Sequence, residues 1–343
     1  GTPLSTVDPA PLVAEEVDRL KVWFAGGPPQ MAGVPDPASL DRYIYTKGKI
    51  LLDMEQLGYL ISRGLLPSCF WKVLQPYMTI FSHIADHPDE QRYVSNQKSF
   101  ETIGLFYNTF LFMPELPRLE NVINPKFESK LAQRQYELSS PNFVIADGLL
   151  TREALDALLR FTTESTIFYE YKLTYSGAYI ADGFAHPLLA QVVQGLRDCF
   201  PNIIGDLPLA NQWAYKYDHN TTGIPPHADN ALVNVNFWIL PDKWNKDPDS
   251  GGIKIILKEP PDDFNMDDYN VFTGQDVSKQ AHFADAQTVT VPYKQNRIVM
   301  FKSTLLHSTV VPNFKPGYSS RRINLTFLFG HRNQAEAQKT FEL

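Results

Sequence analysis

The sequence has little cysteine, no long hydrophobic run and no surplus of positive charge. Its two cysteines, Cys69 and Cys199, lie far apart with no CxxC pair, which excludes a disulfide framework and a thiolate zinc site. This cysteine usage fits a reducing compartment, so we expect a cytoplasmic protein. No apolar run approaches the ~18 residues that a membrane helix needs. The N-terminus also lacks the basic and apolar regions of a signal peptide, so we expect no membrane association.

The charge balance is acidic, with 31 Lys and Arg against 38 Asp and Glu, a net charge of −7. Without a local basic patch, such a surface repels phosphate backbones, so we expect no nucleic-acid partner. Hydrophobic residues make up 43% and charged residues 20%, which excludes wholesale disorder. The motifs GxGxxG, GxxxxGK[ST] and GxSxG do not occur in the second half of the chain, which leaves phosphate loops and nucleophile elbows without support.

The first part of the chain, residues 1–138, has the pattern of a mainly helical region. Asp36-Pro37 is typical of an N-cap followed by proline at the first helical position. Apolar residues then follow helical spacing from residue 40 to residue 61, and Gly64 is placed to end the helix. Pro67 and Pro76 bracket or kink another helical segment. Nothing in the pattern indicates what this region does.

The pattern changes near residue 139, and we predict a second domain from there to residue 343. A short strand within 141–150 precedes Thr151, which is placed to cap a helix, and a second helix is expected over 188–200. Short strands follow at irregular spacing, a pattern of an α+β protein with an antiparallel sandwich or barrel. The expected strands are 212–217, 232–240, 252–257, 288–291, 298–301 and 323–329.

One short motif carries chemistry, His227-Ala228-Asp229. Residues two apart on an extended chain point to the same face, so an imidazole and a carboxylate project together. His307 follows a late strand and is placed to complete a two-histidine, one-carboxylate triad, the arrangement that binds non-haem Fe(II) with open positions. A second HxD match, His87-Pro88-Asp89, is set aside because proline cannot donate to a central sheet ladder.

The last expected strand begins after Arg322, and Arg322, Asn324 and Thr326 would share one face. A guanidinium on the inner face of a strand is unfavourable unless a carboxylate pairs with it. A small dicarboxylate co-substrate would supply that partner through a bidentate contact. Arg321 is expected to point to the opposite face, so we favour Arg322 over Arg321 for this role.

The stretch from about 140 to 330 resembles the prolyl-hydroxylase-like branch of the 2-oxoglutarate/Fe(II) dioxygenases. The resemblance rests on the HxD…H set, on the RxxLT run from Arg322, on Tyr217 upstream of His227, and on the Ser250-Gly251-Gly252 turn. The opening sequence PNFVIADGLLTREALDALLRF also resembles the entry strand and first helix of the family.

This resemblance implies a double-stranded β-helix (jelly-roll) core with flanking helices. It implies that His227, Asp229 and His307 are both the metal ligands and the catalytic set, holding Fe(II). Arg322, Tyr217 and Thr326 would bind 2-oxoglutarate, and O2 would be the second co-substrate. Ascorbate is a candidate additional cofactor. The reaction implied is hydroxylation of an unactivated C–H bond.

The substrate is the least determined part of the prediction. A prolyl or other side chain of a peptide or protein is the first interpretation, and a small molecule such as a free amino acid or natural product is the second. We expect the substrate to approach the loop 175–184, with Gly177 and Gly183 as hinges of a mobile lid, and the strand face of Trp213 and Tyr215.

Other readings of the same residues stay open. Asn234 and Asn236 either replace a second co-substrate contact or face solvent, and the acidic stretch 260–269 is expected to be a solvated insertion rather than a cation site. A hypothesis of another class is a non-catalytic assembly module with a relic barrel, and a further one is a zinc hydrolase that uses the same three ligands. The sequence leaves the oligomeric state open.

Overall fold

The computed structural model describes residues 44–88, 92–94, 103–104, 106–172, 174–261 and 281–332. Two compact units divide the chain. One comprises residues 1–114 with 164–176, and the other comprises 115–163 with 177–343. The predicted domains 1–138 and 139–343 stay a prediction. The Asp36-Pro37 helix start, Asp89 and most of the acidic stretch 260–269 lie outside the described residues.

In the first unit, the helix predicted up to Gly64 begins later than expected. The segment Ile44–Thr46 is a strand, which overturns the prediction of a helix there. The reason is local, because Thr46 caps the following helix by accepting a hydrogen bond from the Lys49 amide at 3.3 Å. The described elements of this unit are β1 (Ile44–Thr46), α2 (Lys47–Ser62), a 3-10 helix (Ser68–Phe70), α3 (Trp71–Ile84), β2 (Arg92–Val94) and β4 (Glu170–Lys172).

The core of the first unit lies between α2 and α3. Leu60, Phe70 and Tyr77 are almost fully buried in one hydrophobic cluster that both helices line. Gly64 has a φ of +69°, so it ends the α2 region as predicted. Pro76 is buried inside α3, which continues past it to Ile84. It therefore does not mark an end of the helix.

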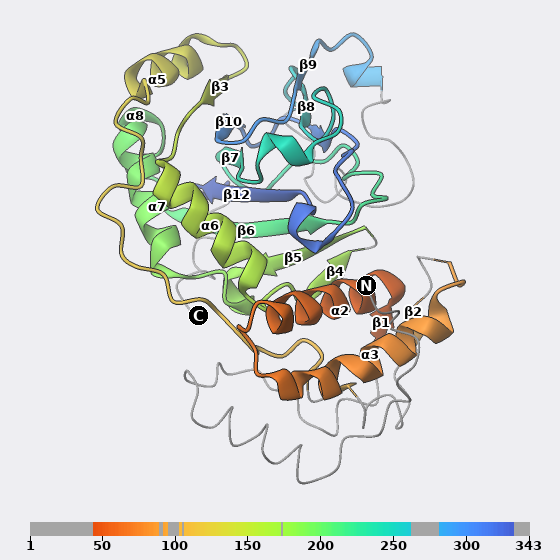
Figure 1. Ribbon diagram of the computed structural model, residues 1–343. Coiled ribbons are helices and arrows are strands. Elements are labelled where there is room, and N and C mark those ends of the chain that lie inside the picture. Colours follow the sequence, from red (N-terminus) through yellow and green to blue (C-terminus); the bar gives the residue numbers. More distant parts are fainter. Residues whose placement is uncertain are drawn as a thin grey trace. The chain divides into compact units, whose positions relative to one another are not determined.

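The second unit contains most of a seven-stranded antiparallel sheet and a three-stranded one (Figure 1). The larger sheet has the order β3-β10-β7-β12-β6-β5-β4, and the smaller one has the order β11-β8-β9. The helices are α5 (Ser129–Leu138), α6 (Arg152–Glu164), α7 (Pro187–Cys199) and α8 (Pro201–Ile204), with 3-10 helices at Ile180–Asp182, Asp242–Trp244, Ala281–Phe283 and Tyr318–Ser320. The strands are β3 (Phe143–Asp147), β5 (Tyr175–Tyr179), β6 (Leu209–Tyr217), β7 (Val233–Trp238), β8 (Ile253–Ile256), β9 (Thr288–Val291), β10 (Arg297–Lys302), β11 (His307–Thr309) and β12 (Ile323–Phe329).

The central strands β7 and β12 are buried along their whole length, on both faces. On one face Phe237 and Phe327 stack with ring centroids 5.6 Å apart, and the Arg197 guanidinium of α7 lies over the Phe329 ring. The opposite face carries the alternate residues, many of them polar. The sheet therefore separates an apolar layer from a polar interior, and the polar interior holds the candidate site.

Much of the predicted secondary structure is confirmed. The six expected strands correspond to β6, β7, β8, β9, β10 and β12, and the helix over 188–200 corresponds to α7. Thr151 accepts a hydrogen bond from the Ala154 amide at 3.2 Å, as expected of an N-cap. The mixture of helices and antiparallel sheets agrees with the α+β class. Among the described residues, no helix combines the length and hydrophobicity needed to cross a bilayer.

The prediction of a lid loop over 175–184 is wrong for its first half, because Tyr175–Tyr179 is strand β5. Gly177 was interpreted as a hinge, but its place in the strand has a packing reason. A Cβ on Gly177 would come within 2.8 Å of the Tyr179 ring and 3.2 Å of the Tyr215 ring. A glycine within a strand is typical of such close approach.

The Ser250-Gly251-Gly252 turn gives a test of the fold. Gly251 has a φ of +71°, and a Cβ on Gly252 would overlap the backbone carbonyl oxygen of Val291. Because that oxygen belongs to the paired strand β9, it cannot move aside easily. Gly252→Ala should lower the free energy of unfolding by roughly 1–3 kcal/mol or more, as overpacking does, measured by chemical denaturation.

The matched control is Gly58→Ala in the middle of α2, where a Cβ would meet only Leu74 at 3.9 Å. Alanine is the better helix former, so this change should leave stability equal or slightly higher. Equal stability of the Gly252→Ala variant and the parent protein would contradict the described turn.

Candidate metal centre

Two histidines from distant parts of the chain meet because their backbones pair. The His227 amide donates to the His307 carbonyl at 3.0 Å, and the His307 amide donates to the His227 carbonyl at 2.8 Å. Residues that exchange both hydrogen bonds in an antiparallel pair place their side chains on the same side. The two imidazole rings accordingly lie with centroids 4.3 Å apart. His307 also opens strand β11, which pairs with β8.

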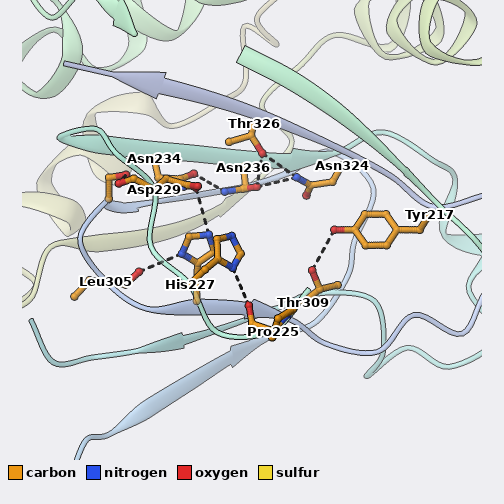
Figure 2. A network of polar contacts seen from close by, with 12 residues as sticks. Tyr217, Pro225, His227, Asp229, Asn234, Asn236, Leu305, Thr309, Asn324 and Thr326 are labelled. Atoms are coloured by element: carbon orange, nitrogen blue, oxygen red, sulfur yellow. Dashed lines mark hydrogen bonds and ion pairs between the residues drawn. The ribbon is translucent and has the colours of Figure 1, made fainter. Parts of the chain in front are cut away.

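Each imidazole is oriented by a contact between its Nδ1 and the backbone carbonyl two residues earlier (Figure 2). His227 Nδ1 lies 2.8 Å from the Pro225 carbonyl oxygen, and His307 Nδ1 lies 3.1 Å from that of Leu305. A carbonyl only accepts, so each Nδ1 carries the proton and donates it. Each Nε2 is then left with a lone pair, which is the form of histidine that binds metals.

Asp229 brings the carboxylate to the same place. Its amide donates to the Ser303 carbonyl at 3.3 Å, and the Ser303 hydroxyl donates to the Asp229 carbonyl at 2.8 Å. Asp229 Oδ2 lies 3.4 Å from His307 Nε2. Each of the three residues offers one ligand atom, and these atoms lie within 4.8 Å of one another, so the three could hold one metal ion. In the described part of the chain this is the sole such cluster of three or more residues.

The electrostatics of the cluster favour ligand protonation states. Burial, together with the neighbouring charge of His307, lowers the pKa of His227 from 6.5 to about 4, against the opposing effect of Asp229. Burial alone would raise the pKa of Asp229. The two neighbouring histidines and the hydrogen bond from the Asn234 amide outweigh burial and lower it. Near neutral pH, His227 is therefore neutral and Asp229 is ionised, as metal ligation requires.

Arg322 lies in the same cavity and has an open donor. The cavity is lined by all three residues of the triad and by Arg322, whose side chain is almost completely buried. Arg322 Nε donates to the Gly251 carbonyl, and its guanidinium stacks 4.4 Å from the centroid of the Tyr217 ring. Its Nη1 has no hydrogen-bond partner in the described part of the chain. Among the described residues no carboxylate pairs with it.

Arg321 has the opposite surroundings. Its guanidinium forms an ion pair with Asp218 and also donates to the Tyr217 carbonyl oxygen. Arg321 is not among the residues that line the cavity of the triad. The expected division of the two neighbours between opposite faces therefore holds, and the cavity receives Arg322.

The other two predicted co-substrate residues also line this cavity. The Tyr217 hydroxyl lies 3.1 Å from Thr309 Oγ1, and Thr326 Oγ1 donates to Asn236 Oδ1 at 2.9 Å. Trp213 and Tyr215, expected near the substrate, line the cavity as well, with their rings stacked at 5.8 Å. The roles of all these residues stay predictions, while their gathering around one cavity is observed.

Sequence reasoning missed a buried polar network behind the triad. Asn234 and Asn236 are 0% and 5% exposed, so the interpretation that they face solvent is wrong. Asn234 donates to Asp229 Oδ2, and Asn236 lines the cavity. The alternation Val-Asn-Val-Asn at 233–236 was the available signal. An alternating strand indicates polar residues on one face, but not whether another layer covers that face.

No protein-family model matches the sequence, and no curated protein is similar to it by sequence. Solved structures with a similar fold include the non-haem α-ketoglutarate-dependent carbocyclase SnoK from nogalamycin biosynthesis. It has 13% identity and a TM-score of 0.45, and the match covers 62% of this chain and 90% of SnoK.

Two prolyl hydroxylases are also among the similar structures. The Trichoplax adhaerens enzyme, in complex with a fragment of the hypoxia-inducible factor, has 12% identity and a TM-score of 0.41, covering 62% of this chain and 92% of its own. The Pseudomonas putida prolyl-4-hydroxylase has 14% identity and a TM-score of 0.38, covering 60% of this chain and 100% of its own.

Proposed function

We propose that this protein is an Fe(II)- and 2-oxoglutarate-dependent dioxygenase that hydroxylates an unactivated C–H bond. One observation carries the proposal. The cluster of His227, Asp229 and His307 shares a cavity with the buried guanidinium of Arg322, which has an open donor. The two antiparallel sheets around this cavity support a double-stranded β-helix core.

The donor set fits iron. Two neutral imidazoles and one carboxylate on one side of a centre form the facial triad typical of non-haem Fe(II) oxygenases. His227, Asp229 and His307 would hold the ion, and with 2-oxoglutarate and O2 the ion supplies the oxidant. The chain's own part is to orient both rings through the two Nδ1 contacts to backbone carbonyls, which leaves Nε2 as the nitrogen that would bind the ion.

The surroundings of Arg322 support 2-oxoglutarate as the co-substrate. A buried guanidinium without a carboxylate partner is unfavourable, and an unsatisfied buried donor costs about 1–3 kcal/mol. A dicarboxylate would satisfy Arg322 Nη1 with one end while its other end reaches the metal. Tyr217 fixes the guanidinium plane by stacking, and Gly251 fixes Nε, so the arginine is pre-organised for this contact.

The rest of the cavity bears on the substrate. Apart from the triad and Arg322, no residue that lines it carries a formal charge, and Trp213, Tyr215 and Ile224 supply apolar surface. Trp213 Nε1 is buried and has no hydrogen-bond partner among the residues that the structure describes. These features favour a neutral reacting group with an oxygen acceptor. A prolyl or other side chain of a peptide fits this description, and the alternative is an uncharged part of a small molecule.

Hypotheses of other classes give Arg322 no role. A relic barrel that only mediates assembly has no reason to keep the triad together with an unpaired buried arginine. A zinc hydrolase could use the three ligands, but zinc hydrolysis requires no dicarboxylate anchor. Dependence on 2-oxoglutarate therefore separates the proposal from both alternatives.

The direct test is to add Fe(II) and 2-oxoglutarate without oxygen, admit oxygen, and assay succinate. The parent protein should bind 2-oxoglutarate only with metal and should form succinate, and His307→Ala should abolish both. Arg322→Gln should weaken 2-oxoglutarate binding about 10–100-fold, because hydrogen bonds to charged groups contribute about 1.5–3 kcal/mol.

Arg152→Gln is the matched control, since Arg152 is an exposed arginine paired with Asp156 on α6. It should bind 2-oxoglutarate like the parent protein. Metal-dependent binding that is unchanged in Arg322→Gln, or unchanged turnover in His307→Ala, would contradict the proposal. A peptide and metabolite screen for oxygen addition by mass spectrometry would then identify the substrate.

The pKa of His227 predicts how acid affects the metal-free protein. Its pKa is about 4 in the folded state against 6.5 for the ordinary side chain, so the unfolded state binds the proton more readily. The free energy of unfolding should therefore fall as the pH drops from about 6.5 to about 4. The slope from this one group is at most about 1.4 kcal/mol per pH unit.

Urea denaturation at a series of pH values measures this slope. His227→Asn removes the titrating ring, so its stability should depend less on pH within this window than that of the parent protein. The same pH dependence in both proteins would show that His227 is not held neutral by its surroundings.

A further inference from the structure

A chain of hydrogen-bonded amides leads away from the metal-site carboxylate (Figure 2). Asn234 Nδ2 donates to Asp229 Oδ2, and Asn236 Nδ2 donates to Asn234 Oδ1. Asn236 Oδ1 in turn accepts from Asn324 Nδ2 at 2.8 Å and from Thr326 Oγ1 at 2.9 Å. Three amides and one hydroxyl are thus linked in series to a single carboxylate.

The network is built into the middle of the larger sheet. Asn234 and Asn236 are alternate residues of β7, and Asn324 and Thr326 are alternate residues of β12. Asn236 lies opposite Thr326 in the register of these strands. All four side chains are less than a tenth exposed, so water does not compete for their hydrogen bonds. Buried polar groups of this kind have to be satisfied by one another.

The charge of Asp229 determines the direction of every bond in the series. An ionised carboxylate only accepts, so Asn234 must present its NH2 group to it. The Asn234 oxygen then faces Asn236, which must donate in turn. The Asn236 oxygen finally faces Asn324 and Thr326, both of which donate to it. No member can flip its amide without opposing two acceptors, so each fixes the next.

We propose that Asn234 is a positioning residue for the metal, held in place by Asn236 and, behind it, by Asn324 and Thr326. Asn234 occupies one oxygen of Asp229 and keeps the carboxylate facing the two imidazoles instead of rotating away. The inference rests on the proposed function for the presence of a metal at this site. It adds that the order of the carboxylate depends on an amide that does not itself belong to the triad.

A purely structural role for the asparagines predicts a different result. If the asparagines only filled the sheet interior, replacing them would lower the melting temperature and leave metal binding by the folded protein unchanged. A positioning role predicts that metal affinity falls, and that it falls most for the residue nearest Asp229. The effect should be graded along the series, with Asn234 first and Asn236 second.

The experiment measures Co(II) binding by the full chain, by calorimetric titration and by visible absorption. Cobalt serves as the probe because its d–d bands respond to coordination number and geometry. Asn234→Leu keeps the approximate size of the side chain but removes the donor. It should weaken Co(II) binding about 10–100-fold, the usual effect of losing a partner of a metal ligand, and change the d–d spectrum. Asn236→Leu should weaken binding less.

Gln212→Leu is the matched control. Gln212 is a buried amide of β6 in the same sheet, 6% exposed, and it donates to the Phe184 carbonyl at 2.8 Å instead of joining the network. Its replacement should lower the melting temperature and leave Co(II) affinity and spectrum unchanged. Circular dichroism of each metal-free variant confirms that the measured protein is folded, and if Asn234→Leu does not fold, Asn236→Leu carries the test.

The outcomes separate the two proposals. If the parent protein binds no Co(II), the proposed function fails and this inference fails with it. If the parent binds Co(II) and Asn234→Leu binds it with the same affinity and spectrum, the inference alone is overturned. It is also overturned if Gln212→Leu loses as much affinity as Asn234→Leu, since the loss would then report general softening of the sheet.

Discussion

Two backbone hydrogen bonds between His227 and His307 determine the geometry of the whole site. They join the segment before β7 to the first residue of β11, and they direct both imidazoles to one side. A separate backbone hydrogen bond from the Asp229 amide to the Ser303 carbonyl holds the third residue of the triad beside them. The ligand set is therefore a product of main-chain pairing. Hydrogen bonds of the side chains then determine the tautomer and rotamer of each histidine, after the backbone has fixed its position.

The interior that receives these side chains is unusually polar for a sheet buried on both faces. β12 presents Leu325, Phe327 and Phe329 to one layer and Asn324 with Thr326 to the other. Burying amides and hydroxyls is unfavourable unless each finds a partner, and here the network satisfies its members internally. A satisfied buried network specifies one packing arrangement more strongly than apolar contacts do. One exception is the guanidinium of Arg322, whose Nη1 has no partner among the described residues.

The sequence was sufficient to place His227 beside Asp229, because HxD is a local pattern and extended chain places residues two apart on one face, whereas His307 was predicted from its position after a late strand. The choice of Arg322 over Arg321 followed from the same alternation, and the structure puts Arg322 in the cavity. The asparagines of β7 could not be assigned in this way. Alternation distinguishes two faces of a strand, but only the second sheet, assembled from residues far along the chain, shows that the polar face is covered.

The predicted boundaries of secondary-structure elements were wrong where tertiary contacts outweighed the local sequence pattern. Gly177 was predicted as a hinge, yet it lies in β5, where two tyrosine rings leave little room for a side chain. Strand β11 is only three residues long, too short for a periodicity to be recognised, and it exists because β8 and His227 pair with it. Both features depend on neighbours that are distant in the chain, which no window of sequence contains.

Because Arg321 and Arg322 are adjacent, the register of β12 decides which of the two guanidinium groups faces the cavity. In the present frame one guanidinium is neutralised by Asp218 and its neighbour serves the cavity. A slip of one residue between β12 and β6 would exchange the two faces. It would turn Asn324 and Thr326 toward the apolar layer and break the amide series at the same moment. The register of β12 therefore decides both which arginine faces the cavity and whether the amide series can form.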